Sequence, residues 1–168
     1  MPYDPEIHHR RSVRLVSHNY SDPGSYFVTI CAFEKRCYFG SIENFEVRLS
    51  LVGTIINKCW HSIPTWFPSV TLDHFVIMPN HLHAILVLDQ RDSNTKPPAS
   101  LSTIVRSFKS ACTRHFDQQA ATEPKNIWQR NYHEHIIRSR RRLFELRQYI
   151  LDNPTNWHLD ELYTDSLR

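Results

Sequence analysis

The sequence predicts an α+β fold of the ferredoxin-like type, in which split βαβ units build an antiparallel sheet with helices on one face. Three observations predict it. Segments rich in β-branched and aromatic residues alternate with segments of helical periodicity, in the order strand, helix, strand, strand, helix, strand. A Pro-Asn break between the two middle strands indicates a tight turn. One more amphipathic segment follows the last strand and predicts an extra C-terminal helix.

The first half of the chain supplies one strand and one helix of this plan. Residues 25–33 predict the strand, and residues 50–62 predict a helix with one apolar stripe. Gly40 is interpreted as a turn residue, and residues 45–49, which alternate apolar and charged side chains, predict a short edge strand. The prolines at both ends of 64–68 indicate a loop.

The middle hairpin carries a histidine pair. Its strands are predicted at about 69–78 and 81–88, and the second begins His81-Leu82-His83. Side chains alternate faces along a strand, so both imidazoles lie on one face and Leu82 on the other, where it can pack into the core. Two imidazoles about 7 Å apart along a strand can converge on one metal ion. The alternative is one hydrogen-bonded histidine and one exposed histidine.

The second half predicts a helix over 101–116, a polar loop from 117 to 125 and a last strand over 132–138. Ser139 then opens the extra helix, and Pro154 stops it. The predicted buried stripe of that helix consists of Leu143, Leu146, Ile150 and Leu151.

The extra helix also carries a tyrosine and an amide four residues apart. Tyr149 and Asn153 lie on one flank of the helix, so both can face the same small volume. With the two histidines they make a candidate set of three metal ligands, His81, His83 and Asn153, and one nucleophile, Tyr149. A tyrosine hydroxyl with a pKa of about 10 needs activation at neutral pH. The alternative is that Tyr149 is a packing residue and Asn153 only ends the helix.

A second His-x-His pattern competes with the first. In Tyr132-His133-Glu134-His135 the middle residue is Glu, so the pattern lacks the apolar wedge that Leu82 provides. On a strand Tyr132 and Glu134 share one face, and the two histidines share the other. We interpret this group mainly as site lining, with His135 as a candidate hydrogen-bonding partner behind the metal ligands.

Basic residues are candidates for contacts with nucleic-acid phosphates. They lie in the N-terminal arm, on the second helix and around the last strand and helix; the candidates are Arg10, Arg11, Arg14, Arg106, Lys109, Arg130, Arg138, Arg140, Arg141 and Arg142. Aromatic side chains interleaved with them could stack on bases. The alternative is a solvated helix face or a plain polar tail.

Composition limits the class of protein. The chain has 168 residues, which predict one domain, and we expect a basic arm at 1–24, a domain at 25–160 and a tail at 161–168. Apolar runs are too short for a membrane span, and the N-terminus has no signal core. The four cysteines form no C-x-x-C pair, and we interpret them as reduced thiols of a cytoplasmic protein. Three scattered glycines exclude a P-loop.

Five blocks of the chain, in order, resemble a known family. They are Ser25-Tyr26-Phe27-Val28-Thr29-Ile30-Cys31, Met78-Pro79-Asn80-His81-Leu82-His83, Ser107-Phe108-Lys109-Ser110, the stretch from Trp128 to Arg138, and Tyr149-Ile150-Leu151-Asp152-Asn153-Pro154. This combination is similar to the single-tyrosine HUH transposases of insertion sequences, and most closely to the REP-associated tyrosine transposases. The resemblance covers about residues 10–160.

The resemblance implies cleavage and rejoining of single-stranded DNA at hairpin or palindromic sites. Tyr149 would attack a phosphate and form a 5′-phosphotyrosine link with release of a 3′-OH. His81, His83 and Asn153 would hold a divalent ion. Asn in place of the Gln of many insertion-sequence members fits the REP-associated branch. Two imidazoles and one amide suit Mn²⁺ and accept Mg²⁺ if water and phosphate complete the site, while Zn²⁺ could bind and inhibit.

Three other functions fit parts of the sequence. One is a domesticated DNA-hairpin-binding protein without cleavage activity, which would have no use for an intact nucleophile. A replication initiator or relaxase is disfavoured because the chain has no room for a helicase region and because the tyrosine follows the histidines. A metal-dependent hydrolase of small substrates would not show salt-dependent DNA binding. The sequence leaves open whether the protein is a monomer or a homodimer.

Overall fold

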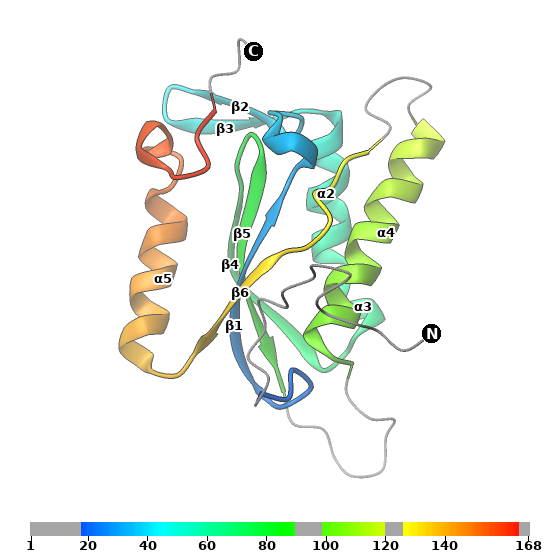
Figure 1. Cartoon of the computed structure of the whole chain (residues 1–168), viewed down its shortest axis with the longest axis vertical. Helices are drawn as coiled ribbons and strands as arrows, with labels where there is room; N and C mark the ends of the chain where they lie inside the picture. The colour runs from blue at the N-terminus through cyan, green and yellow to red at the C-terminus, as the bar shows by residue number, and fades with distance from the viewer. Residues whose placement is uncertain (1–17, 90–98, 120–125, 165–168) are drawn as a thin grey trace, which may run out of the picture.

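A four-stranded antiparallel sheet forms the centre of the computed structural model, which describes residues 18–89, 99–119 and 126–164. Its strands are β1 (Gly24–Cys31), β4 (Val70–Ile77), β5 (His81–Leu88) and β6 (His133–Ile137), in the order β4-β5-β1-β6 (Figure 1). All neighbouring pairs are antiparallel. This order, with α2 between β1 and β4 and α4 between β5 and β6, confirms the ferredoxin-like prediction.

The helices lie on both faces of the sheet. On one face lie α2 (Leu51–His61) and α4 (Leu101–Gln119), and on the other lies α5 (Arg140–Asp152), the predicted extra helix (Figure 1). Ser139 caps α5 by accepting a hydrogen bond from the backbone nitrogen of Arg142, as its position predicted. The face that would otherwise be free is therefore covered by the helix that carries Tyr149.

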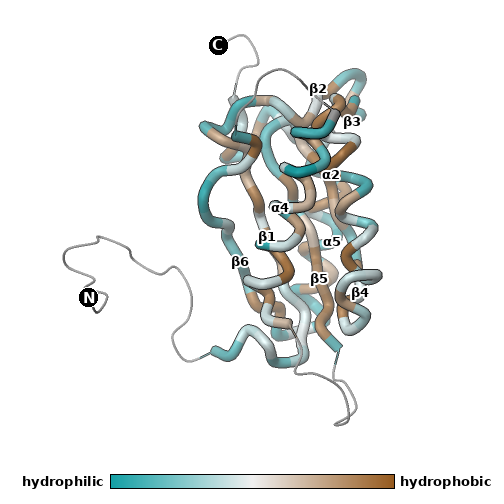
Figure 2. The backbone as a smooth tube through the Cα atoms, turned by 90° about the vertical axis from the view of Figure 1, so that its right-hand side faces the viewer, coloured by the Kyte–Doolittle hydropathy of each residue, from teal (hydrophilic) through white to brown (hydrophobic). Residues whose placement is uncertain are grey.

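Alternation along β5 divides the core into two layers. Leu82, Ala84 and Leu86 are fully buried in the large cluster that includes α2 and α4, whereas Ile85 packs with Leu146 and Ile150 under α5. Hydrophobic stretches accordingly run along β1 and β5 (Figure 2). The smaller layer holds α5 against the sheet, so it sets where the C-terminal end of this helix lies relative to the two histidines.

Four details differ from the sequence prediction. Gly40 is not a turn residue but begins β2 (Gly40–Glu43), which pairs with β3 (Glu46–Leu49) in a separate two-stranded ribbon. The predicted loop at 64–68 contains the short helix α3 (Ile63–Trp66), because a proline is tolerated in a first helical turn. The helix predicted to end at 116 continues to Gln119. Leu151 is exposed, since it lies at the edge of the stripe and not within it.

Two glycines are required where backbones come close together. A Cβ on Gly53 would overlap the carbonyl oxygen of Phe39, and one on Gly40 would overlap that of Arg48. We therefore expect Gly53→Ala to lower the free energy of unfolding by roughly 1–3 kcal/mol, because the backbones must move apart. Urea denaturation measures it, with Thr54→Ala on the same helix as the control. A Gly53→Ala protein as stable as wild type would contradict this close approach.

The described chain ends pack on the sheet domain. The backbone nitrogen of Leu101 donates to the carbonyl of Tyr20, and His18 contacts the hydroxyl of Tyr26. After α5 the chain forms the 3-10 turn Trp157–Leu159 and returns to the top of the sheet (Figure 1). Another 3-10 turn, Phe33–Lys35, follows β1. None of the helices in the described ranges is long and apolar enough to cross a membrane.

Candidate metal and nucleophile site

The two histidines of β5 lie side by side on the face covered by α5. In register, His81 pairs with Cys31 and His83 pairs with Thr29 of β1. Both histidine side chains are buried, and their ring centroids lie 4.3 Å apart. The sequence prediction that both imidazoles share one face and that Leu82 packs into the core is confirmed.

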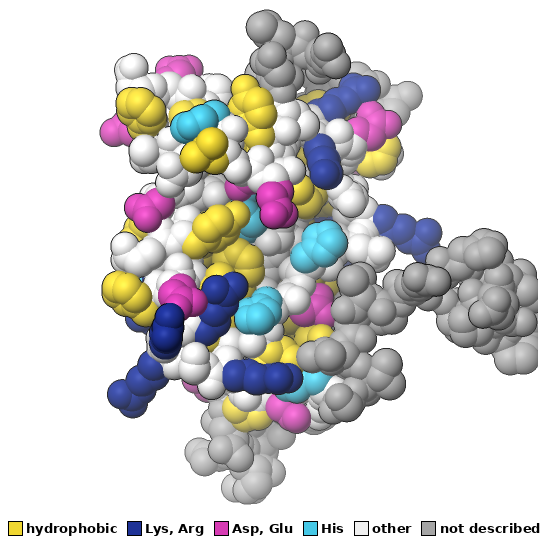
Figure 3. Space-filling view, turned by 60° about the vertical axis from the view of Figure 1, so that its left-hand side comes forward, with side chains coloured by type: hydrophobic (Ala, Val, Ile, Leu, Met, Phe, Trp, Pro, Cys, Tyr) yellow, Lys and Arg dark blue, Asp and Glu magenta, His cyan; other side chains and the backbone are white. Residues whose placement is uncertain are grey.

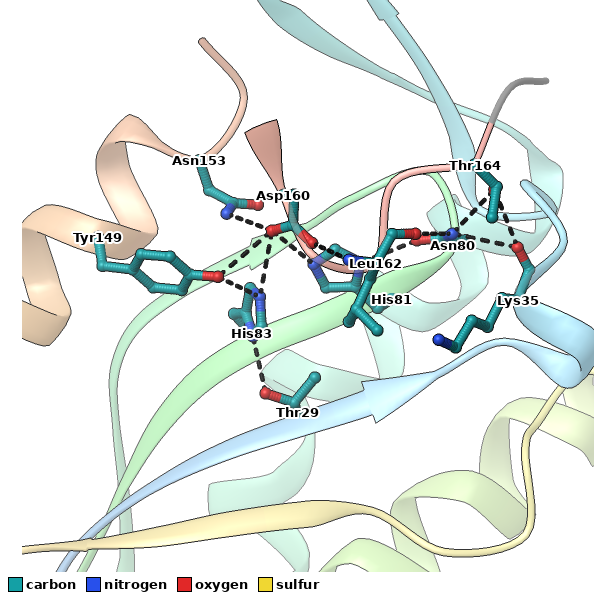
Figure 4. A network of polar contacts seen from close by, with 10 residues as sticks. All are labelled: Thr29, Lys35, Asn80, His81, His83, Tyr149, Asn153, Asp160, Leu162 and Thr164. Carbon is teal, nitrogen blue, oxygen red and sulfur yellow. Dashed lines mark hydrogen bonds and ion pairs between the residues drawn. The ribbon is translucent and has the colours of Figure 1, made fainter. Parts of the chain in front are cut away.

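Hydrogen bonds behind the rings fix their orientation (Figure 4). Nδ1 of His81 lies 2.8 Å from Oδ1 of Asn80, an oxygen that can only accept, so the hydrogen of this imidazole must sit on Nδ1. Nε2 of His81 then carries no hydrogen and presents a lone pair, and this nitrogen is buried without a hydrogen-bond partner. Nδ1 of His83 lies 2.8 Å from the hydroxyl of Thr29. Burial, and then the neighbouring His83, lower the pKa of His81 to about 3, so it is neutral at pH 7.

Asp160 completes a group of three side chains that could hold a metal ion. Its Oδ2 lies 3.9 Å from Nε2 of His81 and 3.8 Å from Nε2 of His83. Such spacings fit three ligands that each lie about 2.1 Å from one ion. Burial alone would raise the pKa of this carboxyl, but the nearby imidazole of His83, together with hydrogen bonds from Asn153 and from the backbone nitrogen of Leu162, holds the pKa well below its usual range. Asp160 is therefore an anion at neutral pH.

Tyr149 reaches the same group from α5. Its hydroxyl lies 3.1 Å from Nε2 of His83 and 3.3 Å from Oδ2 of Asp160 (Figure 4). The ring packs edge-on against His83 and Phe27, yet the residue stays 44% exposed. Burial of the hydroxyl, and then the charge of Asp160, raise the pKa of Tyr149 to about 12. The phenol is thus protonated, open to a large substrate and next to the candidate ligands.

Asn153 is buried beside Asp160, but it presents its nitrogen to the group. Nδ2 donates a 2.9 Å hydrogen bond to Oδ2 of Asp160, while Oδ1 is buried without a partner. The prediction that Tyr149 and Asn153 face one small volume is confirmed by these contacts. The structure also brings the carboxylate of Asp160 to the two histidines, and the sequence prediction did not include this residue.

The competing His-x-His pattern stands apart from this group. His133 and His135 pair with Thr29 and Phe27 across β1, so they lie on the same face as His83, but both are exposed on the edge strand β6. Within the described ranges no hydrogen bond joins His135 to His81, His83 or Asp160. The partners behind the candidate ligands are Thr29 and Asn80 instead, and a pattern search for charged or titratable residues overlooks both.

A charged pair ties α5 to the edge strand β4. Nε of Arg147 donates a 3.0 Å hydrogen bond to Oδ1 of Asp73, whose side chain is mostly buried. Burial would raise the pKa of Asp73, but hydrogen bonds from Arg147 and His74 outweigh it and lower the pKa to about 2. This pair, like Leu146 and Ile150, fixes the helix that positions Tyr149.

We expect Asp73→Asn to lower the free energy of unfolding by roughly 1–2 kcal/mol at pH 7. The pKa of Asp73 is below its unfolded value of about 3.9, so its stabilisation is complete above that value and is lost as the pH falls towards 2. Urea unfolding at pH 7 and at pH 2.5 measures the difference. Glu145→Gln, in an exposed pair on the same helix, is the control. An equal loss at both pH values would contradict this assignment.

The candidate phosphate-binding residues fall into three groups. Arg138, Arg140, Arg141 and Arg142 surround the first turn of α5, where positive charge opposes the helix dipole and thus does not favour folding. Lys and Arg side chains gather at this lower end of the face that carries α5 (Figure 3). Arg106 and Arg130 line a groove of about 950 Å³ between α4 and residues 128–132. Arg10, Arg11 and Arg14 lie outside the described residues.

Lys109 lines the same groove, but its ammonium group is engaged within the protein. Nζ donates to the carbonyl oxygens of Gln129 (2.8 Å) and Asn131 (2.7 Å), and it lies 5.8 Å from the ring centroid of Trp128. Burial lowers its pKa to about 8. The side chain therefore holds the segment before β6 against α4, and at most one of its three donors is left for a ligand.

The sequence and the fold match a family of transposases. A family model described as "Transposase IS200 like" matches residues 56–153, from α2 to Asn153. The chain belongs to this family of IS200-like transposases. Within it, the resemblance to REP-associated tyrosine transposases is confirmed by a Haemophilus influenzae protein named as a candidate REP-associated tyrosine transposase. That protein is 30% identical over 88% of this chain and 79% of its own length.

One more relative and two solved structures are similar to this chain. An uncharacterized Haemophilus influenzae protein is 40% identical over 97% of this chain and 98% of its own length. The structure of a REP-associated tyrosine transposase bound to a REP hairpin has the same fold, with a TM-score of 0.64, 21% identity, and coverage of 89% of this chain and 77% of that one. A candidate transposase of Deinococcus radiodurans R1 gives a TM-score of 0.50, 16% identity, and coverage of 85% and 97%.

Proposed function

We propose that this protein is a single-stranded DNA endonuclease and strand transferase that acts at hairpin or palindromic DNA. One observation carries the proposal: the hydroxyl of the half-exposed Tyr149 lies 3.1 Å from an imidazole nitrogen of the His81-His83-Asp160 group. A packing tyrosine needs no such neighbours. A protein that only binds hairpins needs neither the phenol nor a buried unpartnered imidazole nitrogen.

The chemistry follows from the position of the phenol. Oη of Tyr149 attacks the phosphorus of a DNA phosphodiester, the bond to the 3′ oxygen breaks, and a 5′-phosphotyrosine link and a free 3′-OH result. The phenolic proton passes to water, and the leaving oxygen takes up a proton. The link keeps the energy of the phosphodiester, so a second 3′-OH can reverse the reaction and join a new strand.

The residues present fit a divalent metal. The donor set combines two imidazoles with one carboxylate, which suits Mn²⁺ and accepts Mg²⁺ if water and phosphate oxygens complete the site. His81, His83 and Asp160 would hold it, and the ion would supply positive charge to the phosphate oxygens. We propose that Asn153 adds an oxygen ligand when its amide turns, since its Oδ1 is buried without a partner.

We expect Asp160→Ala to weaken Mn²⁺ binding by roughly tenfold or more, because it removes the only anion of the donor set. Calorimetric titration of Mn²⁺ into the DNA-free protein measures this, with Glu161→Ala as the neighbouring control. Unchanged Mn²⁺ affinity together with faster cleavage would contradict this role. It would show instead that the Asp160 side chain blocks a coordination position and must move away before the metal and DNA bind productively.

We propose two surfaces for the DNA. The arginines at the start of α5 lie on the same helix as Tyr149, so they suit phosphates near the cleaved bond. Arg106 and Arg130, in the groove beside α4, suit the backbone of a paired stem. The basic residues of the arm at 1–24 would add phosphate contacts. His135, exposed on the face of the site, would line the path between these surfaces.

The arrangement of the chain supports three further parts of the proposal. Tyr149 contacts His83 of its own chain, so one copy contains a whole site and a monomer suffices. The catalytic domain spans 25–160, and the described part of the tail, 161–164, packs against it through Asn80. A DNA substrate places the protein in the cytoplasm, where its four cysteines stay free thiols.

A cleavage assay on hairpin DNA tests the proposed function. Palindromic hairpins with unpaired flanks, labelled on either side of the stem, are incubated with Mn²⁺, with Mg²⁺ or with a chelator and then separated on a denaturing gel. We expect a labelled band of protein size for one label position only, and only with metal. Salt-dependent binding of the same hairpins without any covalent band would support the binding-only alternative and overturn the nuclease.

A further inference from the structure

The tip of the β2–β3 ribbon carries a phenylalanine where the backbone disfavours one. Glu43 pairs with Glu46, so Asn44 and Phe45 form a two-residue turn, with φ values of 52° and 65°. Both are in the left-handed region, as in a type I′ turn, where Gly is strongly preferred at the second position. A bulky residue there is a rare exception. Phe45 is also 68% exposed, so burial does not offset this cost.

The exposed ring borders a cavity of about 500 Å³. Its walls come from the ribbon and from the segment after α5; they are Ser41, Ile42, Asn44, Phe45, Pro154, Thr155, Trp157, His158 and Tyr163. Hydrophobic side chains gather around a histidine at this upper end of the face that carries α5 (Figure 3). The walls thus offer aromatic planes together with short polar groups, and no lining residue is acidic.

The cavity adjoins the candidate metal site. Pro154, at its edge, directly follows Asn153 in the chain. The ring of Trp157 lies 5.8 Å from that of His81 on one side and 5.1 Å from that of Tyr163 on the other. One indole therefore separates the cavity from the buried histidine.

We propose that this cavity receives an unpaired nucleobase of the strand that adjoins the attacked phosphate, with Phe45 as a stacking surface. The proposal rests on the proposed function, because that function brings single-stranded DNA to this end of the molecule. A nucleobase has flat apolar faces and a polar edge, which match the aromatic walls and the Ser41, Asn44 and Thr155 side chains. Stacking on a base would explain why an exposed phenylalanine stands at position 45, although its left-handed backbone conformation lowers the stability of the fold.

Phe45→Gly tests the proposal without threatening the fold, since Asn-Gly is the preferred type I′ turn. We expect its melting temperature to equal or exceed that of wild type. Its affinity for a hairpin with an unpaired flank should fall about 5- to 150-fold, the range for one base–aromatic stack. Its affinity for the same stem without a flank should not change. Fluorescence anisotropy measures both, with Tyr149→Phe present in all proteins to prevent cleavage.

Phe144→Ala is the matched control, because it removes another highly exposed phenylalanine, on α5 and away from the cavity. We expect no flank-dependent loss for it. A 2-aminopurine base in the flank should be quenched on binding, and Phe45→Gly should relieve this quenching. Equal affinities of Phe45→Gly and its parent for the flanked hairpin would overturn the proposal. The cleavage assay with Tyr149 intact is separate, so failure of the base site and failure of the nuclease can be told apart.

Discussion

We expect Tyr149→Phe to form no covalent adduct with hairpin DNA while it binds the same DNA within about twofold of wild type. The substitution removes only Oη, and the ring keeps its edge-on contacts with Phe27 and His83. His83 loses one neighbour but keeps Thr29 behind it, so Mn²⁺ affinity should also be retained. A denaturing gel with labelled DNA and Mn²⁺ measures the adduct, and calorimetry measures the metal.

Tyr132→Phe is the matched control for this prediction. Tyr132 precedes β6, lines the groove beside α4 and packs against the large core cluster that includes α2 and α4. We expect this variant to form the adduct at the wild-type rate. An adduct that persists in Tyr149→Phe and disappears in Tyr132→Phe would move the nucleophile to the second His-x-His pattern and would contradict the site described above.

The parts of the site that depend on local periodicity could be predicted from the sequence. Side chains two residues apart on a strand point to the same face of the sheet. The prediction of a strand at 81–88 therefore also predicts that His81 and His83 lie together. Side chains four residues apart on a helix are neighbours, so a helix here places Tyr149 and Asn153 on one flank. The fold order followed from the same periodicities. Each of these predictions needs only the geometry of one element.

The parts of the site that depend on where the chain runs after α5 could not be predicted from the sequence. Asp160 stands in a polar stretch without periodicity, seven residues beyond Asn153, and only the turn after Pro154 brings it to the histidines. An amphipathic stripe shows that α5 is buried on one side but does not show against which face of the sheet. The prediction that Gly40 is a turn residue was wrong for a related reason. The sequence alone does not distinguish a glycine in a turn from a glycine that is required because another backbone segment lies close to it.

Asn80 links the candidate metal site to the C-terminal segment, and its replacement gives the second large expected effect. Its Nδ2 lies 2.8 Å from the carbonyl of Leu162 and 3.1 Å from both the carbonyl of Lys35 and the hydroxyl of Thr164. Because its nitrogen faces these acceptors, its oxygen must face Nδ1 of His81. The amide thus keeps the hydrogen of His81 on Nδ1 and leaves Nε2 free for a metal.

We expect Asn80→Leu to weaken Mn²⁺ binding about 10- to 100-fold, the usual range for a partner that orients a metal-binding histidine. Without the oxygen acceptor, the hydrogen of His81 can move to Nε2, and the ring can turn. The ¹⁵N shifts of the His81 ring in the metal-free protein report this directly: they indicate Nδ1–H in wild type and a mixture of tautomers in the variant.

Two companion variants separate this role from simple support of the fold. Asn80→Asp keeps an oxygen for His81, so its ring signals should still indicate a hydrogen on Nδ1 even though the tether to Leu162 is lost. Thr164→Val removes one acceptor of the tether without touching His81, and we expect its Mn²⁺ affinity to stay within about twofold of wild type. If Asn80→Leu kept both the Nδ1–H signal and wild-type Mn²⁺ affinity, the ring would be oriented by packing, with Trp157 and His83 as its neighbours.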